Sequence, residues 1–246
     1  MRPAAVILIL SIIFPPNTAH SKPLIFSSGP NKVALLELYT SQGCSSCPPA
    51  DAWLSQLKDS PSLWQQLVPV AFHVDYWDYI GWRDPFADQR YNRRQRDYLK
   101  SGNIKSVYTP GFVYAGEEWR GFFKLFSRNK LPDINTETMT LSLTINDKAY
   151  SAKAGNINPK HEQLTLHLAL LGMDIETSVK AGENKGKTLK ENFVVLAYDA
   201  TQQSEAIWHG LLPGNTHNYT TQAIAAWITA SNNPTPLQAT GGWLKE

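Results

Sequence analysis

The chain has 246 residues, of which 42% are hydrophobic and 18% are charged, and these proportions are typical of a folded globular protein. Its 23 Lys and Arg residues nearly balance 21 Asp and Glu residues, leaving a net charge of +2. Nucleic-acid binding needs an excess of positive charge on one face, so we expect no nucleic-acid partner.

The first 21 residues have the pattern of a secretory signal peptide. A positive start at Met1-Arg2 precedes an apolar run over residues 4–14, which Pro15 interrupts, and Ala19-His20-Ser21 places small residues before a cleavage site after residue 21. The apolar run is too short to span a bilayer. We therefore expect a periplasmic or secreted protein without stable membrane insertion after signal removal. An uncleaved anchor is the alternative.

Residues 30–132 alternate between strand-like and helix-like patterns. Apolar runs rich in β-favouring residues indicate buried strands, and apolar residues at helical spacing indicate helices between them. The expected strands are 33–39, 68–77 and 108–115, and the expected helices are 48–67 (interrupted at Pro61), 86–100 and 121–129. This alternation predicts an α/β domain with a largely parallel sheet.

From about residue 136 the hydrophobic pattern changes to period two. Residues 139–145 and 164–170 alternate apolar and polar side chains, and turn signals separate them from further short apolar runs. Such short strands at near-regular intervals are typical of an antiparallel β sandwich. We place the boundary near Pro132 and expect a β-rich domain over 133–246.

Two cysteines, the only ones in the chain, form the motif Cys44-Ser45-Ser46-Cys47 between the first strand and the first helix. Free N–H groups and the helix dipole at a helix N-terminus stabilise a thiolate, and a second thiol two residues later can resolve a mixed disulfide. This placement predicts a redox-active disulfide, with Cys44 as the attacking thiolate and Cys47 as the resolving thiol.

Two other interpretations of the cysteine pair stay open. A structural disulfide would close a loop with only two intervening residues and would stabilise the fold little, since the effect grows with loop length. A copper-handling chaperone could use Cys44, Cys47 and His73 as soft or borderline ligands. Because no second Cys-x-x-C motif is present, we predict no metal and no cofactor.

The sequence resembles a known family over nearly all of the expected mature chain. The motifs that carry the resemblance are residues 37–51, 73–86, 94–96, 108–110 and 182–187. They are similar to the thioredoxin superfamily, and more narrowly to the secreted thioredoxin-like proteins grouped as domain of unknown function 1223. The resemblance implies an α/β thioredoxin-like domain with an elaborated insert, followed by a β-rich, sandwich-like C-terminal domain. It brings no established substrate.

The resemblance also assigns a role to Thr109-Pro110. In a thioredoxin-like fold this place holds a cis-proline packed against the cysteine pair, with neighbouring backbone groups free to hold a substrate chain. Pro110 would thus belong to the catalytic group and Thr109 to the substrate-binding group. Two departures stand out, because Gly43 replaces the tryptophan of ordinary thioredoxins and Pro48 follows the second cysteine directly.

An aromatic and charged block follows the second predicted strand. We expect Trp77 and Trp82 to receive the substrate, and His73 and Asp75 to tune proton transfer, because ligands bind at the carboxyl ends of strands in open α/β sheets. The alternative is that the aromatics are core residues and that Asp75 forms a structural ion pair with Arg83. The basic stretch 90–96 is read as a solvated helix face, and residues 182–187 as a polar hairpin connection.

The favoured function is an exported thiol–disulfide oxidoreductase that acts on a protein or a small thiol or disulfide through a mixed disulfide. A non-catalytic binding module with a fixed disulfide is the competing class. The direction of the redox reaction, the physiological substrate and the oligomeric state are not written in the sequence.

Overall fold

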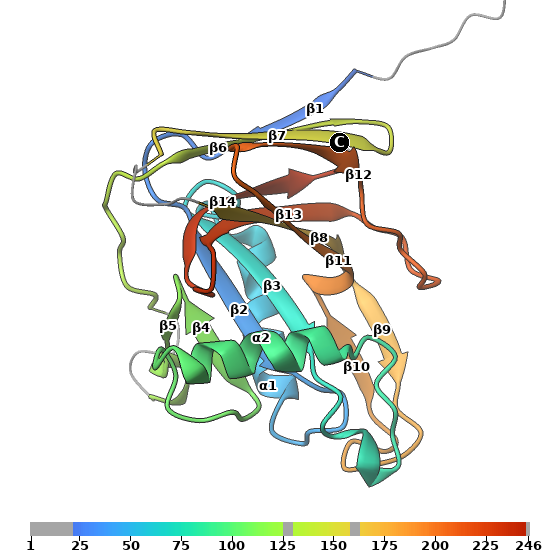
Figure 1. Cartoon of the computed structure of the whole chain (residues 1–246). Helices are drawn as coiled ribbons and strands as arrows, with labels where there is room; N and C mark the ends of the chain where they lie inside the picture. Colours follow the sequence, from blue (N-terminus) through green and yellow to red (C-terminus); the bar gives the residue numbers. More distant parts are fainter. Residues whose placement is uncertain (1–21, 125–129, 158–162, 245–246) are drawn as a thin grey trace, which may run out of the picture.

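A computed structural model describes residues 22–124, 130–157 and 163–244. Within these ranges the chain forms fourteen β-strands, only two α-helices and three short 3-10 helices. Figure 1 shows their arrangement. The fold is therefore β-rich, and the prediction of an α/β thioredoxin-like domain is wrong. The predicted signal peptide, residues 1–21, lies outside the described residues.

One sheet of eight strands runs through the molecule and explains this correction. Its strand order is β14 (Pro236–Trp243), β13 (Ala223–Ala230), β8 (Leu164–Gly172), β11 (Val194–Gln203), β3 (Leu67–His73), β2 (Ala34–Thr40), β4 (Gly111–Tyr114) and β5 (Glu117–Glu118). The predicted strands β2, β3 and β4 exist, with β2 parallel to β3 and β4 antiparallel to β2. However, β11 occupies the other edge of β3, so strands from the second half of the chain extend the same sheet. The domain boundary near residue 132 stays a prediction.

A second sheet covers one face of this large sheet. It contains β1 (Leu24–Ser27), β6 (Thr140–Asn146), β7 (Ala149–Gly155) and β12 (Ile207–Leu211), and it forms the upper layer in Figure 1. Alternate residues of β8, among them Leu166 and Leu168, pack with Leu141 and Leu143 of β6 in one apolar cluster. The period-two pattern predicted a sandwich confined to residues 133–246, whereas the two packed sheets also contain β1, β2 and β3 from the first part of the chain.

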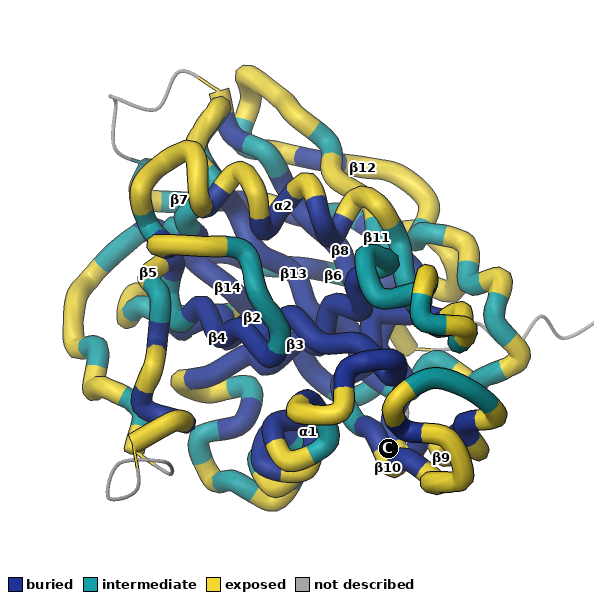
Figure 2. Tube along the Cα trace, turned by 90° about the horizontal axis from the view of Figure 1, so that it is seen from below, coloured by how far each residue is buried: buried dark blue, intermediate teal, exposed yellow. Residues whose placement is uncertain are grey.

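The helices lie on opposite sides of β2, β3 and β4, as Figure 2 shows. They are α1 (Pro48–Ser55) and α2 (Gln89–Lys100), and the 3-10 helices are η1 (Gln56–Asp59), η2 (Asp78–Ile80) and η3 (Gly121–Phe123). The first predicted helix is shorter than expected, because its α-helical part ends at Ser55. Of the predicted helix 121–129 only η3 is described, and residues 125–129 lie outside the described residues.

One charged residue of α2 is buried, which corrects the prediction that the basic stretch is a solvated face. Arg90, Arg93 and Arg96 are exposed, but Arg94 is buried and makes a two-pronged ion pair with the fully buried Glu37 of β2, with N–O distances of 2.6 and 2.9 Å. The tyrosine hydroxyl of Tyr98 also donates to Glu37, at 2.5 Å. This fully hydrogen-bonded arrangement attaches α2 to the sheet, as buried charges require.

A separate two-stranded hairpin stands beside the large sheet. It consists of β9 (Ile175–Ser178) and β10 (Thr188–Glu191), and β10 contacts α1. Its tip, residues 179–187, includes the polar stretch predicted to be a hairpin connection, and that prediction is confirmed. Among the described residues, no helix has both the length and the apolar content that a bilayer crossing requires.

Candidate functional site

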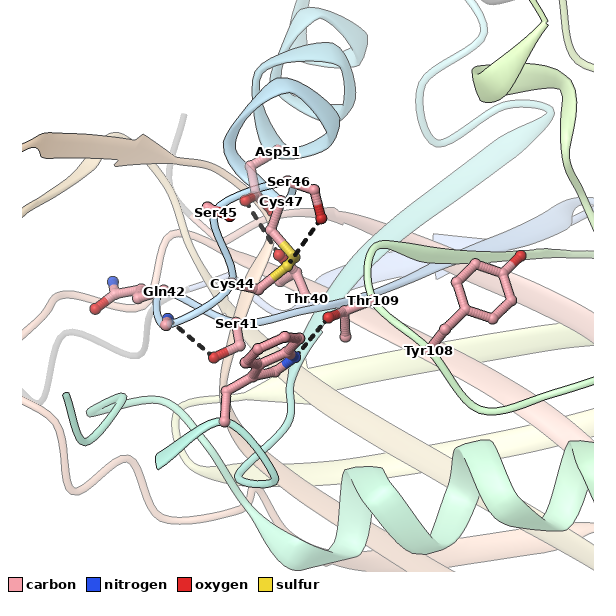
Figure 3. The surroundings of a disulfide bond; sticks show 12 residues. Thr40, Ser41, Gln42, Cys44, Ser45, Ser46, Cys47, Asp51, Tyr108 and Thr109 are labelled. Carbon is pink, nitrogen blue, oxygen red and sulfur yellow. Dashed lines mark hydrogen bonds between the residues drawn. A yellow bond between two sulfur atoms is a disulfide. The ribbon is translucent and has the colours of Figure 1, made fainter. Parts of the chain in front are cut away.

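The cysteine motif forms the turn between β2 and α1. Cys44 and Cys47 are joined in a disulfide, and backbone hydrogen bonds from Cys44 N to Ser41 O (3.1 Å) and from Cys47 N to Cys44 O (3.2 Å) shape the turn (Figure 3). The helix begins at Pro48, as its position after the second cysteine allows. Cys47 nevertheless has helical backbone angles, φ −77° and ψ −40°, so it continues the geometry of α1 by one residue.

The disulfide lies just beneath the surface. Cys44 and Cys47 are only 1% and 0% exposed, while the two serines between them are exposed. The Ser46 hydroxyl lies 3.3 Å from the Cys44 sulfur, so a reagent approaching from solvent meets the serines first. A hydroxyl at this distance can donate to a thiolate when the disulfide opens.

The segment with Thr109 and Pro110 lies against the same turn. Its peptide bond is cis, as the family resemblance implies, and Thr109 appears beside the disulfide in Figure 3. The Trp77 indole nitrogen donates to the Thr109 hydroxyl at 2.7 Å. A Cβ atom on Gly43 would stand 3.1 Å from the Trp77 Cβ, so the Trp77 loop fills the space that a larger residue at position 43 would need.

The predicted site residues of the aromatic block divide into two groups. Trp77 and Trp82 both reach the cysteine turn, the second by donating from its indole nitrogen to Gln42 Oε1 at 3.2 Å. Asp75 instead accepts a hydrogen bond from Asn92 of α2. The structure thus brings the two tryptophans to the cysteine turn, Trp77 beside Gly43 and Trp82 at Gln42, and attaches Asp75 to α2.

The hairpin tip contributes residues to the site from the stretch 182–187, which the sequence predicted only as a polar connection. Asn184, fully buried, donates from its side-chain amide to the backbone carbonyls of Gln42 and Cys44, both at 2.9 Å. Glu183 accepts the backbone N–H of Ser45 at 3.0 Å. The residue types and spacing of this polar turn do not indicate its contacts with the cysteine turn. Those contacts depend on where the β9–β10 hairpin lies relative to the large sheet.

His73 lies in a buried group of charged side chains. Its Nδ1 is 2.8 Å from Asp84 Oδ2, and its Nε2 is 3.9 Å from Glu191 Oε1. Gln42 ties this group to the cysteine turn, since its backbone N–H donates to Asp84 at 2.8 Å and its side-chain amide donates to Glu191 at 2.6 Å. The group therefore combines residues of β3, of the loop before α2 and of β10.

Burial and mutual charge shift the pKa values of this group. Burial alone would lower the pKa of His73, but the carboxyls of Asp84, Glu191 and Asp51 outweigh it and raise the pKa to about 9. Burial, followed by the nearby Glu191 charge, raises the pKa of Asp51 to about 8. Burial also raises the pKa of Glu191, against the opposing effect of His73. Low-dielectric burial favours the neutral carboxyl, which accounts for both increases.

The described residues contain no group of three or more His, Cys, Asp and Glu side chains placed to hold a metal ion. His73, the third ligand of the copper interpretation, makes its close contact with Asp84.

Comparisons with solved structures identify proteins of similar fold. The fold is similar to a crystal structure of protein AGR_C_4864 from Agrobacterium tumefaciens, with a TM-score of 0.59 and 23% identity over 85% of this chain and 94% of that one. It is also similar to HBP35 of Porphyromonas gingivalis, with a TM-score of 0.55 and 12% identity over 89% and 77% of the two chains. A search of curated proteins finds no match.

A family profile described as a protein of unknown function, DUF1223, matches residues 35–229. This range begins in β2 and ends in β13, and it contains the cysteine turn, the aromatic block, Pro110 and the hairpin tip. The chain therefore belongs to the DUF1223 family.

Proposed function

We propose that the protein is a thiol–disulfide oxidoreductase that uses the Cys44–Cys47 disulfide. One observation carries the proposal: the disulfide lies at the start of α1, beneath exposed serines, where the turn also meets Trp77, Trp82 and the hairpin tip. A disulfide in a short turn before a helix can open without moving the sheet, and the helix N-terminus favours the thiolate that results.

The reaction proceeds by two thiol–disulfide exchanges. In the reductive half, a substrate thiolate attacks the Cys44 sulfur, the bond between Cys44 and Cys47 breaks, and Cys47 leaves as a thiolate. A second substrate thiolate then attacks the substrate sulfur of the mixed disulfide, releasing Cys44 and an oxidised substrate. In the opposite direction, Cys44 attacks a substrate disulfide and Cys47 resolves the product. Two electrons pass in each direction.

The contacts at the rim suggest how a substrate is held. Trp77 is fixed by its hydrogen bond to Thr109, and Tyr79 next to it is 81% exposed, with its ring stacked 6.5 Å from that of Trp77. Aromatic side chains of this kind supply rigid contact area for a polypeptide or a small organic disulfide. The partner class is accordingly a protein or a small thiol or disulfide.

The competing function is a binding module with a permanent disulfide. That function is less well supported, because a disulfide that closes a loop with two intervening residues stabilises the fold little. The export signal expected over residues 1–21 supports a periplasmic or secreted location, where disulfides form and persist. The location is part of the proposal.

The reduction potential of the Cys44–Cys47 couple tests this proposal. We expect equilibration with dithiothreitol or glutathione buffers to give a potential above about −300 mV, the range of catalytic disulfides. A Cys47→Ser variant is expected to accumulate a mixed disulfide at Cys44 with a model peptide disulfide, and a Cys44→Ser variant serves as the matched control. A potential below −300 mV together with no covalent adduct would show that the disulfide is structural.

A further inference from the structure

A groove is lined by α2 on one side and by strands of the large sheet on the other. Its volume of about 560 Å³ lies within the range of small-molecule sites. The sheet contributes residues of β8, β11 and β13, and the loop after β13 completes the lining. Exposed and buried positions alternate along α2, as Figure 2 shows. No lining residue belongs to the cysteine turn, the Trp77 loop or the hairpin tip, so the groove is a separate site.

Positive charge dominates the lining of this groove. Among the described residues that line it, four side chains are cations and one is a carboxylate: Arg90, Arg93, Arg94, Lys100 and Asp97. All five belong to α2, where residues three or four positions apart are neighbours on the helix surface. The helix therefore supplies the charge, and the sheet supplies uncharged hydroxyl, amide and aromatic groups.

Arg93 is exposed and forms no ion pair or hydrogen bond with another residue that the structure describes. The other three cations have carboxylate partners: Arg90 pairs with Asp88, Arg94 with Glu37 and Lys100 with Asp97. An anion that enters the groove therefore meets one cation whose charge no described carboxylate neutralises.

Arg90 presents a fixed guanidinium group to the same groove. Its Nε and Nη2 donate to the Asp88 carboxylate at 3.0 and 2.8 Å, and its Nη1 donates to the Tyr198 carbonyl at 2.7 Å. The guanidinium carbon also lies 5.6 Å from the centre of the Tyr198 ring. These contacts use only part of the donors of a guanidinium, whose planar N–H groups match the geometry of carboxylate and phosphate oxygens.

The sheet side of the groove is a chain of neutral, hydrogen-bonded side chains. His167 Nδ1 lies 2.7 Å from the Tyr198 hydroxyl, and its Nε2 lies 3.0 Å from Thr229 Oγ1. The imidazole stacks on Trp227 with 5.0 Å between ring centres, and the Arg94 guanidinium lies 5.2 Å from the Trp227 ring. Burial, and then the positive charge of Arg94, hold the pKa of His167 well below its usual range. This side therefore adds no negative charge to the groove.

The C-terminal end of α2 opposes anion binding, because a helix carries roughly half a negative charge there. Two features weaken this effect. The Ser101 hydroxyl donates to the carbonyls of Asp97 and Tyr98, at 3.0 and 3.1 Å, and Lys100 places a cation in the last turn. The balance in the groove is positive, since the charge of Arg93 exceeds the partial charge that remains at the helix end.

We propose that this groove binds an oxyanion, the phosphate or carboxylate group of a small molecule, with Arg93 as the main cation and Arg90 and Lys100 in support. The inference goes beyond the proposed redox function and does not depend on it. The sequence predicted a solvated helix face here, because the exposure of Arg93 alone does not distinguish the two cases. Only the position of β8, β11 and β13 beside α2 turns this face into one wall of a groove.

Calorimetric titration with pyrophosphate and, separately, with citrate tests the proposal at constant ionic strength. We expect at least one of these anions to form a one-to-one complex, and the one that binds more tightly identifies the ligand as a phosphate or a carboxylate. Arg93→Gln is expected to weaken binding about tenfold, the loss that follows from removing one hydrogen bond to a charged group. Arg96→Gln is the matched control, because Arg96 is an exposed arginine of the same helix that does not line the groove, and it should leave the affinity unchanged.

Two further measurements locate the bound anion. Asp97→Asn is expected to strengthen binding, because it removes the carboxylate from the lining and frees Lys100 from its ion pair. In nuclear magnetic resonance spectra the ring signals of His167 should shift as the anion is added, whereas those of His209, exposed on β12, should not. The inference is overturned if neither anion binds, if Arg93→Gln and Arg96→Gln weaken binding equally, if Asp97→Asn weakens it, or if the His167 signals stay unchanged.

Discussion

Asn184 donates its side-chain amide to the backbone carbonyl of Cys44 at 2.9 Å, across 140 residues of sequence. A second hydrogen bond from the same amide reaches the Gln42 carbonyl, and Lys187 holds the amide oxygen at 2.9 Å. The hairpin tip therefore fixes the backbone of the cysteine turn from outside the segment that contains it.

Removing this amide should loosen the turn. We expect Asn184→Ala to lower the free energy of unfolding by about 1–3 kcal/mol, because the Gln42 carbonyl loses the Asn184 donor and the Cys44 carbonyl keeps only the backbone N–H of Cys47. It should also speed reduction of the disulfide, since the turn around Cys44 is less constrained. Urea denaturation and the rate of reduction by dithiothreitol measure the two effects. Asn135→Ala, at an exposed position, should change neither, and an Asn184→Ala protein as stable as the wild type would refute the prediction.

The contact between Gly43 and the Trp77 loop predicts a size limit at position 43. A Cβ atom there would stand 3.1 Å from Trp77 Cβ and 3.3 Å from Ile80 Cδ1, closer than ordinary van der Waals contact. We expect Gly43→Ala to shift the loop and weaken the hydrogen bond from Trp77 to Thr109, with a loss of about 1–3 kcal/mol as for other overpacked sites. Tryptophan fluorescence and thermal unfolding report both. Gly214→Ala is the matched control, because open space surrounds Gly214. Gly102→Ala is unsuitable, because Gly102 has a positive φ.

The buried pair of Arg94 and Glu37 predicts a large, specific loss of stability. Arg94→Met leaves the fully buried Glu37 carboxyl without its cation, and breaking one side of such a pair destabilises by about 3–5 kcal/mol. The double variant Glu37→Gln with Arg94→Met should be destabilised less than the single Arg94→Met variant. Denaturant unfolding provides the comparison, and Arg93→Met, on the exposed face of α2, should stay within about 0.5 kcal/mol of the wild type. Strict additivity of the two substitutions would contradict the assigned contact.

The charged cluster predicts a loss of stability at alkaline pH. The folded-state pKa of His73, about 9, lies above its ordinary value of 6.5, so its stabilising effect is complete below pH 6.5 and is lost as pH rises through 9. The shift corresponds to about 3 kcal/mol. The raised pKa values of Asp51 and Glu191 act in the same direction, because the folded state holds their protons more tightly.

We therefore expect the free energy of unfolding, measured with urea, to fall between pH 6.5 and pH 9. Glu191→Gln should make this fall shallower, since it removes one raised carboxyl and part of the field that raises the pKa of His73. Arg93→Met, outside the cluster, should leave the slope unchanged. Stability that is constant or rises over this range would contradict the assigned protonation states.

Local residue patterns predicted several strands and the start of the first helix well. The apolar run 33–39 and the alternation over 164–170 correspond to β2 and β8 almost residue for residue, because burial on one or both faces of a sheet imposes those periods. The start of α1 at Pro48 was likewise expected from local residues, whereas the cis bond before Pro110 was expected only from the family resemblance. The predicted fold class failed for a non-local reason, since the residue pattern of β3 does not say which strand occupies its second edge.

The sequence by itself determined the chemistry available to this protein: one cysteine pair in a turn before a helix, a Thr-Pro segment, and strands with alternating burial. Only the tertiary structure decided what surrounds that pair. Placing β11 beside β3 makes the large sheet continuous, and the β9–β10 hairpin then brings Asn184 and Glu191 against the cysteine turn. These contacts join residues more than 100 positions apart, and their energies come from burial and hydrogen-bond geometry that exist only once the sheet has formed.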